Sequence, residues 1–263
     1  ARLHAIWGAG QLNAKDIAEL VADVELDADL RAAAATVTGD LHLRAFASPS
    51  GQFAPNMISY SSPLVSALDD PSPKLQRAAA TALGKAISSW DLEARGLHDR
   101  LFARLEAVGE SDPALRNALV GPLVKLGASA NFSGSFGPYS WNLTYNTAAV
   151  GSEHARIGAV LALRRLRDRL IATYLTDSNE RVVVEAARGI YDEQIADAMP
   201  ALASQIERKE LGSTALVRRV LHANFRLGAR SNAAALANFA TRETADELHR
   251  WEAVDLLSKW VEP

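Results

Sequence analysis

The sequence predicts an all-α protein built from stacked helical hairpins, and three observations favour this fold class. Similar segments recur along the 263 residues, each with Asp or Ser near its start, an Arg soon after, and small or aliphatic residues at helical spacing. Several of these segments end in Gly, which permits the left-handed cap of a helix C-terminus. No segment shows the alternation of apolar and polar residues that is typical of a β-strand.

The recurring segments are clearest at residues 71–84, 112–127 and 177–190. Asp and Ser at their starts can accept hydrogen bonds from the first backbone N–H groups of a helix, and Pro is tolerated in the first turn. Four further segments fit the same register, at residues 2–10, 154–163, 216–228 and 248–257.

Shorter amphipathic segments lie between these repeats. They are found at residues 15–22, 63–68, 96–107, 168–175, 199–207 and 232–240. Two helices per unit, at an irregular spacing of about 25 to 47 residues, predict a right-handed α-solenoid of the HEAT/armadillo kind with about seven or eight helical pairs. We expect one such domain over residues 1–263. The chain begins inside an amphipathic pattern, as expected for a piece of a longer multidomain protein.

Two segments interrupt this pattern, at about residues 39–62 and 128–152. Long loops inside compact folds are uncommon and are usually functional or disordered. Large aromatic side chains with polar groups are typical of contact surfaces, so the aromatic residues of these segments are candidates for binding a partner. The alternative is that the loops fold back and fill the groove of their own solenoid. The candidates are Phe53, Tyr60, Phe132, Phe136, Tyr139, Trp141 and Tyr145. His42 and Met57 are weaker candidates for axial haem ligands, because a lone His or Met in a loop is seldom one.

Composition excludes several classes of function. The chain has no cysteine, so disulfides, zinc–thiolate sites, thiol catalysis and covalent haem attachment are absent from it. A net charge of −3 gives no general attraction to nucleic acid. The six histidines have no metal-ligand spacing, and no nucleotide-binding or hydrolase motif is present. His4 and His222, within apolar helical patterns, are expected to be packed or hydrogen-bonded. We therefore expect no catalytic residue, metal or cofactor in this chain, no transmembrane segment and no signal-peptide layout.

The recurring arginines have two interpretations. They either line a surface for an acidic partner or phosphate backbone, or pair with the loop carboxylates of Asp70, Asp112 and Asp177 and so hold the stack together. The second, structural interpretation is the expected one. The arginines concerned are Arg77, Arg116, Arg156, Arg181 and Arg218.

Three stretches carry a resemblance to a known family. They are Arg-Leu-His-Ala-Ile-Trp-Gly-Ala-Gly-Gln-Leu (residues 2–12), Val-Glu-Ala-Ala-Arg-Gly-Ile-Tyr-Asp-Glu-Gln-Ile (184–195) with Met-Pro-Ala-Leu-Ala (199–203), and Leu-Leu-Ser-Lys-Trp-Val-Glu-Pro (256–263). Together they resemble the HEAT-repeat region of the haem-binding, membrane-bound-dehydrogenase-like proteins of planctomycetes and verrucomicrobia.

In that family a propeller dehydrogenase domain precedes the repeats and a cytochrome c domain follows them. The resemblance therefore implies a non-catalytic scaffold or interaction module in an exported, periplasmic oxidoreductase whose haem c lies elsewhere in the protein. Its partners would be adjacent domains or another protein.

The alternative is a HEAT-fold DNA glycosylase or another nucleic-acid-binding protein. The basic run at residues 164–169 and the residues Trp7, Trp141 and Trp251 would supply its groove. The negative net charge and Asp168 within the run count against it, and such a run is usually a solvated helix end.

Overall fold

The computed structural model describes residues 2–12, 15–47, 62–87, 95–128 and 151–260, and these residues form an all-α protein. Within them the secondary structure consists of α-helices and short 3₁₀ helices, with no strand. This confirms the predicted fold class. The chain divides into two compact units, Ala1–Leu143 and Thr144–Pro263, which are described separately below. The continuous right-handed solenoid and the single domain stay predictions.

The first unit is built from seven described α-helices. They are α1 (Arg2–Gln11), α2 (Glu19–Ala22), α3 (Ala28–Ala47), α4 (Pro63–Ser66), α5 (Pro73–Ala86), α6 (Arg95–Val108) and α7 (Pro113–Ala128), with 3₁₀ turns η1 (Lys15–Ala18) and η2 (Ala67–Asp69). Their starts follow the predicted capping, since Ser72 Oγ accepts a hydrogen bond from Leu75 N and Asp112 Oδ1 from Leu115 N.

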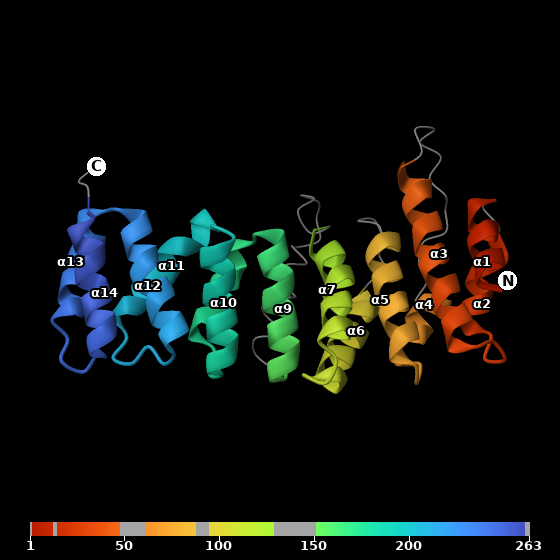
Figure 1. Cartoon of the computed structure of the whole chain (residues 1–263), viewed down its shortest axis with the longest axis horizontal. Coiled ribbons are helices and arrows are strands. Elements are labelled where there is room, and N and C mark those ends of the chain that lie inside the picture. Colours follow the sequence, from red (N-terminus) through yellow and green to blue (C-terminus); the bar gives the residue numbers. More distant parts are fainter. Residues whose placement is uncertain (1, 13–14, 48–61, 88–94, 129–150, 261–263) are drawn as a thin grey trace. The chain divides into compact units, whose positions relative to one another are not determined.

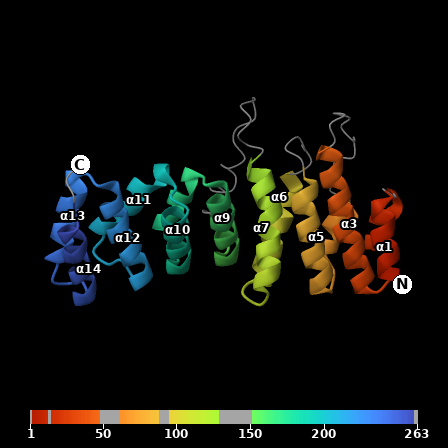
Figure 2. The same cartoon turned by 45° about the horizontal axis from the view of Figure 1, so that its top comes forward.

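Small residues bring the long helices of this unit close together. Helix α3 packs on α5 and α5 packs on α7, and the three stand side by side in Figures 1 and 2. Their contact is rich in fully buried alanines, among them Ala34 and Ala35 of α3 and Ala79 and Ala80 of α5. Alanine loses no side-chain entropy in a helix and lets neighbouring backbones approach closely.

The predicted start of the first interruption at residue 39 is wrong. Helix α3 continues through Gly39 to Ala47, so the break falls after the helix. Gly39 serves a different purpose, because a Cβ built on it would lie 2.7 Å from Ala82 Cα and 2.8 Å from Ala82 Cβ. Glycine is needed here for close approach of α3 and α5 rather than to end a helix. The second interruption, at about residues 128–152, lies almost wholly outside the described residues and stays a prediction; the flanking helices α7 and α9 end at Ala128 and begin at Glu153.

The second unit contains six described α-helices joined by 3₁₀ segments. They are α9 (Glu153–Leu166), α10 (Glu180–Asp192), α11 (Met199–Ser204), α12 (Thr214–Leu227), α13 (Arg230–Ala240) and α14 (Glu247–Ser258), with η5 (Arg169–Thr176), η6 (Ala196–Ala198) and η7 (Gln205–Glu207). The predicted segment at residues 168–175 is thus a 3₁₀ helix rather than an α-helix, and Asp168 caps it through Leu170 N.

Neighbouring helices of the second unit pack in chain order. Helix α9 contacts α10, α10 contacts α12, and α12 contacts both α13 and α14. Branched aliphatic residues fill the core, such as Val182 and Ile190 of α10 and Val220 and Leu221 of α12. Asn224 is buried among them and donates through Nδ2 to the carbonyls of Ala203 and Val220. This packing brings one row of charged side chains on α9, α10, α12 and α14 within reach of each other.

Candidate functional site

The seven aromatic residues predicted to bind a partner all lie outside the described residues, as does Met57. Phe53 and Tyr60 belong to residues 48–61, and the other five belong to residues 129–150. Their partner-binding role therefore stays a prediction. His42 is described and lies in helix α3 rather than in a loop. Its Nδ1 is 2.8 Å from the carbonyl oxygen of Thr38, an ordinary contact within a helix.

Two of the predicted loop carboxylates form buried ion pairs with arginine. Arg156 Nε lies 2.8 Å from Asp177 Oδ2, and the two side chains are 14 % and 5 % exposed. In the first unit Arg31 Nη1 lies 2.8 Å from Asp70 Oδ2, and this pair is similarly buried. In both cases the Arg is the fourth residue of its helix and the Asp stands two residues before the next N-cap. The structural interpretation is confirmed for Asp177, whose partner Arg156 was predicted. Asp70 is also held in an ion pair, but its partner Arg31 was not among the predicted arginines.

The remaining residues of that prediction behave differently from one another. Asp112 caps α7. Arg181 Nη1 pairs with Glu153 Oε1 at 2.7 Å, and Arg218 Nε pairs with Glu252 Oε1 at 3.0 Å. Arg77 and Arg116 form no ion pair with a described residue. The arginines thus mostly join neighbouring helices of their own unit.

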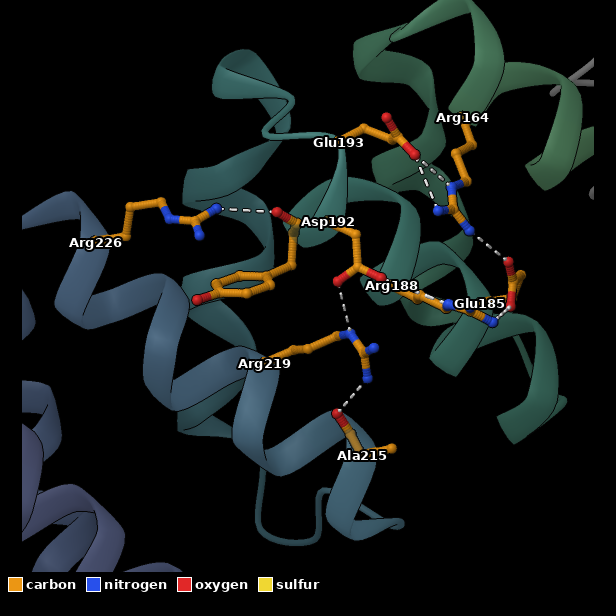
Figure 3. Close-up of polar contacts among 9 residues, drawn as sticks. Arg164, Glu185, Arg188, Asp192, Glu193, Ala215, Arg219 and Arg226 are labelled. Atoms are coloured by element: carbon orange, nitrogen blue, oxygen red, sulfur yellow. Dashed lines mark hydrogen bonds and ion pairs between the residues drawn. The ribbon is translucent and has the colours of Figure 1, made fainter.

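Arg164, the first residue of the basic run at the end of α9, is paired with carboxylates of α10 and of Glu193, which directly follows that helix. Arg164 Nη2 lies 2.9 Å from Glu193 Oε1 and Arg164 Nη1 lies 3.4 Å from Glu185 Oε1, as Figure 3 shows. Burial opposes the charge on Arg164, but the hydrogen bond that it donates to Glu193 and the nearby carboxylates raise the pKa of its guanidinium. Arg167, in the left-handed conformation at φ 53°, ends the helix. These contacts favour the interpretation of the run as a helix end and count against a nucleic-acid groove.

A groove of about 530 Å³ lies between α10 and α12. Its lining residues are Tyr191, Asp192, Thr214, Ala215, Arg218, Arg219 and His222. Three or four residues separate most of those on α12, so their side chains share one face of the helix. The groove is open, is lined by more apolar than polar surface, and is large enough for a small ligand.

The cations of this groove are already engaged by the protein. Arg219 Nε lies 3.6 Å from Asp192 Oδ1, and its Nη1 donates to the carbonyl oxygen of Ala215 at 3.1 Å (Figure 3). The guanidinium of Arg226 lies 4.0 Å from the Tyr191 ring centroid. An anionic ligand would have to compete with these carboxylate, carbonyl and aromatic contacts.

The groove does not assemble a hydrolytic triad. His222 Nε2 lies 3.0 Å from Glu252 Oε1, the oxygen that also accepts a hydrogen bond from Arg218. A His–carboxylate pair activates a nucleophile when a Ser, Thr or Cys lies within reach of the other imidazole nitrogen. Among the described residues His222 makes no such contact. His222 is hydrogen-bonded as expected, whereas His4 is exposed on α1 and its expected packing is wrong.

The last helix presents a stripe of exposed apolar residues that the sequence analysis did not identify. The apolar stripe of α14 consists of Leu248 (70 % exposed), Trp251 (63 %) and Val254 (42 %). Their spacing of three residues places them on one face, opposite the buried residues Ala253 and Leu256. The signal was present in the sequence, because apolar residues occupy both faces of this segment. In the first unit, Leu3 and Trp7 of α1 are likewise exposed.

No group of three His, Cys, Asp or Glu side chains in the described ranges is arranged to hold a metal ion. No helix in the part of the chain that the structure describes is both long and apolar enough to cross a bilayer.

The chain matches no protein-family model and no curated protein.

Proposed function

We propose that this chain is a non-catalytic helical-repeat module that presents surfaces to an adjacent domain or another protein. The apolar stripe of α14 carries this proposal. Exposed Leu, Trp and Val side chains gathered on one helix face are typical of a surface that another protein covers. Burying one such side chain contributes about 1.5 to 3 kcal/mol, so three together supply a substantial part of a docking energy.

The chemistry of Trp251 supports a docking role. Tryptophan is enriched among the residues that dominate binding energies, because it combines large apolar area with one hydrogen-bond donor. Trp251 Nε1 donates to Glu247 Oε1 at 3.3 Å, so the ring is oriented along the exposed face of its own helix. A partner covering this ring would leave that hydrogen bond intact.

The ion pairs of the second unit favour a role for this unit as a rigid scaffold. Ion pairs connect α9 with the end of α10, α10 with α12, and α12 with α14. They involve Arg164, Asp192, Arg219 and Glu252. Networks of ion pairs hold neighbouring elements in a fixed geometry more effectively than isolated surface pairs. Neither the groove nor the basic run of this unit presents the set of residues that a catalytic mechanism needs.

The resemblance to the dehydrogenase-like proteins suggests which kind of partner covers the apolar stripe of α14. On that basis, the module links a propeller dehydrogenase domain to a cytochrome c domain in an exported, periplasmic oxidoreductase. The haem would belong to the cytochrome domain, since this chain has no cysteine to attach it. The aromatic residues of the two interruptions would add to the contact surface.

The nucleic-acid alternative has less support. A groove that follows a phosphate backbone needs cations that are free to bind phosphate. Arg164, Arg218 and Arg219 instead contact carboxylates of neighbouring helices. Strong binding of a DNA duplex at moderate salt would favour this alternative over the proposed role.

Hydroxyl-radical footprinting tests whether the stripe is covered. The natural full-length gene product and the 263-residue chain are oxidised in parallel, and the oxidation of Leu248 and Trp251 is measured by mass spectrometry. We expect both residues to be oxidised readily in the 263-residue chain and strongly protected in the natural protein. Leu227, exposed at the end of α12 and outside the stripe, is the internal control. Equal oxidation of Trp251 in the two samples would contradict coverage of the stripe by an adjacent domain of the same protein.

A further inference from the structure

A second hollow lies where helices α12 and α14 begin. It has a volume of about 390 Å³ and is lined by the loop before α12, the start of α12, the end of α13 and the start of α14. The lining residues that matter for its chemistry are Lys209, Thr214, Arg242, Asp246 and His249. We propose that this hollow binds a small ligand through a single oxyanion group, a carboxylate or a phosphate.

His249 is the residue that points to a ligand. Its side chain is only 8 % exposed, and its Nε2 is buried without a hydrogen-bond partner among the described residues. Buried polar side-chain atoms nearly always have a partner, because leaving one unsatisfied costs about 1 to 3 kcal/mol. Since His249 lines the hollow, a ligand in it can supply the partner that the protein does not.

Two cations of the hollow lack a carboxylate partner in the described ranges. Arg242 donates through Nη1 and Nη2 to the carbonyls of Arg208 and Ile206, both at 2.9 Å, and lies 5.1 Å from the Phe239 ring centroid. These contacts hold the guanidinium in place but leave its charge uncompensated. Lys209 forms no ion pair with a described residue either. Both differ from Arg218 and Arg219 of the groove, which face Glu252 and Asp192.

The helix termini add to the attraction of an anion. Helices α12 and α14 both begin at the hollow, and the first-turn N–H groups of a helix carry a partial positive charge. Ser213 and Asp246 cap these helices by accepting from Leu216 N and Leu248 N. Gly212, at φ +70°, turns the preceding loop into the start of α12.

Two carboxylates limit the ligand to one of low charge. Asp246 and Glu210 also line the hollow. They offset part of the positive charge and would repel a polyanion, whereas a single oxyanion can bind near Lys209 and Arg242. The second carboxylate oxygen of Asp246 can accept a hydrogen bond from a hydroxyl or amine of the same ligand. The inference does not depend on the proposed scaffold role.

An NMR titration tests the proposal directly. The imidazole signals of the 263-residue chain are followed while inorganic phosphate or acetate is added at constant ionic strength and pH. We expect the His249 signals to shift and saturate, with a dissociation constant on the order of 1 mM for the better probe. The His222 signals are the internal control. Tighter phosphate binding indicates a phosphate ester as the natural ligand, and tighter acetate binding indicates a carboxylate.

Variants separate a specific site from a general effect of salt. Lys209→Ala removes an exposed cation without disturbing the fold and is expected to weaken binding about tenfold, the effect of one charge-assisted contact. His249→Gln is expected to weaken it similarly, and His222→Gln, in the other groove, to leave it unchanged. Absence of a saturable His249 shift with both probes would overturn the proposal. Unchanged binding in the Lys209 and His249 variants would overturn it as well.

Discussion

The two units of this protein hold their helices together by different means. In the first unit, glycine and alanine allow α3, α5 and α7 to approach closely, so that a Cβ on Gly84 would lie 3.3 Å from the backbone carbon of Gly121. In the second unit, bulkier aliphatic residues fill the core and ion pairs join the exposed faces of α9, α10, α12 and α14. The close approach at Gly39 cannot accept a larger side chain. Among the described residues the first unit has fewer ion pairs between helices, such as Lys74–Asp29 and Lys85–Asp40, so the second unit is expected to depend more on salt.

One element is common to both units. The buried pairs Arg31–Asp70 and Arg156–Asp177 occupy equivalent places, between one helix and the turn before the next. An equivalent pair in two differently packed units indicates that the pair fixes the helix-to-helix turn. The nature of the helix contact can then vary around it.

Removing one partner of these common pairs is expected to have the largest effect. Asp177→Ala leaves Arg156 buried without its carboxylate, and we expect a loss of about 3 kcal/mol in the free energy of unfolding. Asp70→Ala should act similarly on the first unit. Urea unfolding followed by circular dichroism measures both. The double change Arg156→Met with Asp177→Leu is the control, because apolar replacement of a whole pair is often neutral. A small effect of Asp177→Ala would show that the pair does not fix the turn.

Enlarging Gly39 is expected to have the next largest effect and to act on the first unit alone. Gly39→Leu places side-chain atoms against the backbone of Ala82, and overpacking of this kind costs about 3 kcal/mol. Hydrogen exchange of α3 and α5 peptides should speed up, while that of α10 and α12 peptides should not. Gly8→Ala is the matched control, since a Cβ there meets nothing within 4 Å and should be neutral or stabilising.

Removing a partly buried ion pair of the second unit should lower the free energy of unfolding by a smaller amount. Arg164→Ala removes the contacts to Glu185 and Glu193, and we expect a cost of about 1 to 2 kcal/mol that shrinks in high salt. Lys74→Ala removes an exposed pair with Asp29 in the first unit and should cost about 0.5 kcal/mol or less. Hydrogen exchange at low and high salt checks both. Equal salt dependence of α5 and α10 peptides would break the comparison between the units.

The smallest expected effect is a pH dependence of the stability of the first unit. Burial lowers the pKa of His98 below its ordinary value of 6.5, although Asp99 acts in the opposite direction. Below pH 6.5 the unfolded chain therefore binds more protons at His98 than the folded chain does. The free energy of unfolding of the first unit falls as the pH drops through this range. Exchange of α6 peptides should speed up on mild acidification, and His98→Gln should reduce this response. A response that is unchanged in the variant would assign it to another group.

The sequence was sufficient to predict most of the helices and their caps, because these depend on local patterns. Helix α3 (Ala28–Ala47), the longest of the described helices, was not among the predicted segments. Ser72, Asp112 and Asp168 each cap the segment they were expected to start. The first interruption was predicted to start too early, at residue 39, because close approach of Gly39 to Ala82 on another helix leaves no local signal in the sequence. Arg156 was interpreted correctly as the partner of Asp177, whereas the partner of Asp70 is Arg31, which the repeat pattern did not single out.

The site was harder to predict, because it depends on contacts between distant residues. Glu252 approaches His222 across 30 residues of sequence, and no local pattern announces that contact. The stripe of α14 was missed because residues 248–257 fit the helical repeat pattern, and Trp251 was considered only as part of a nucleic-acid groove. The hollow at α12 and α14 joins four elements, and His249 looks like any helical histidine until its surroundings are known.

The mass and visible absorption spectrum of the natural full-length gene product, purified from its source, test the central claim most directly. If this chain is the connecting module of an exported oxidoreductase, the product will be much larger than 28.2 kDa and will show the Soret band of haem. A colourless protein of about 28.2 kDa would contradict the claim. The exposed stripe of α14 would then have to bind a separate protein.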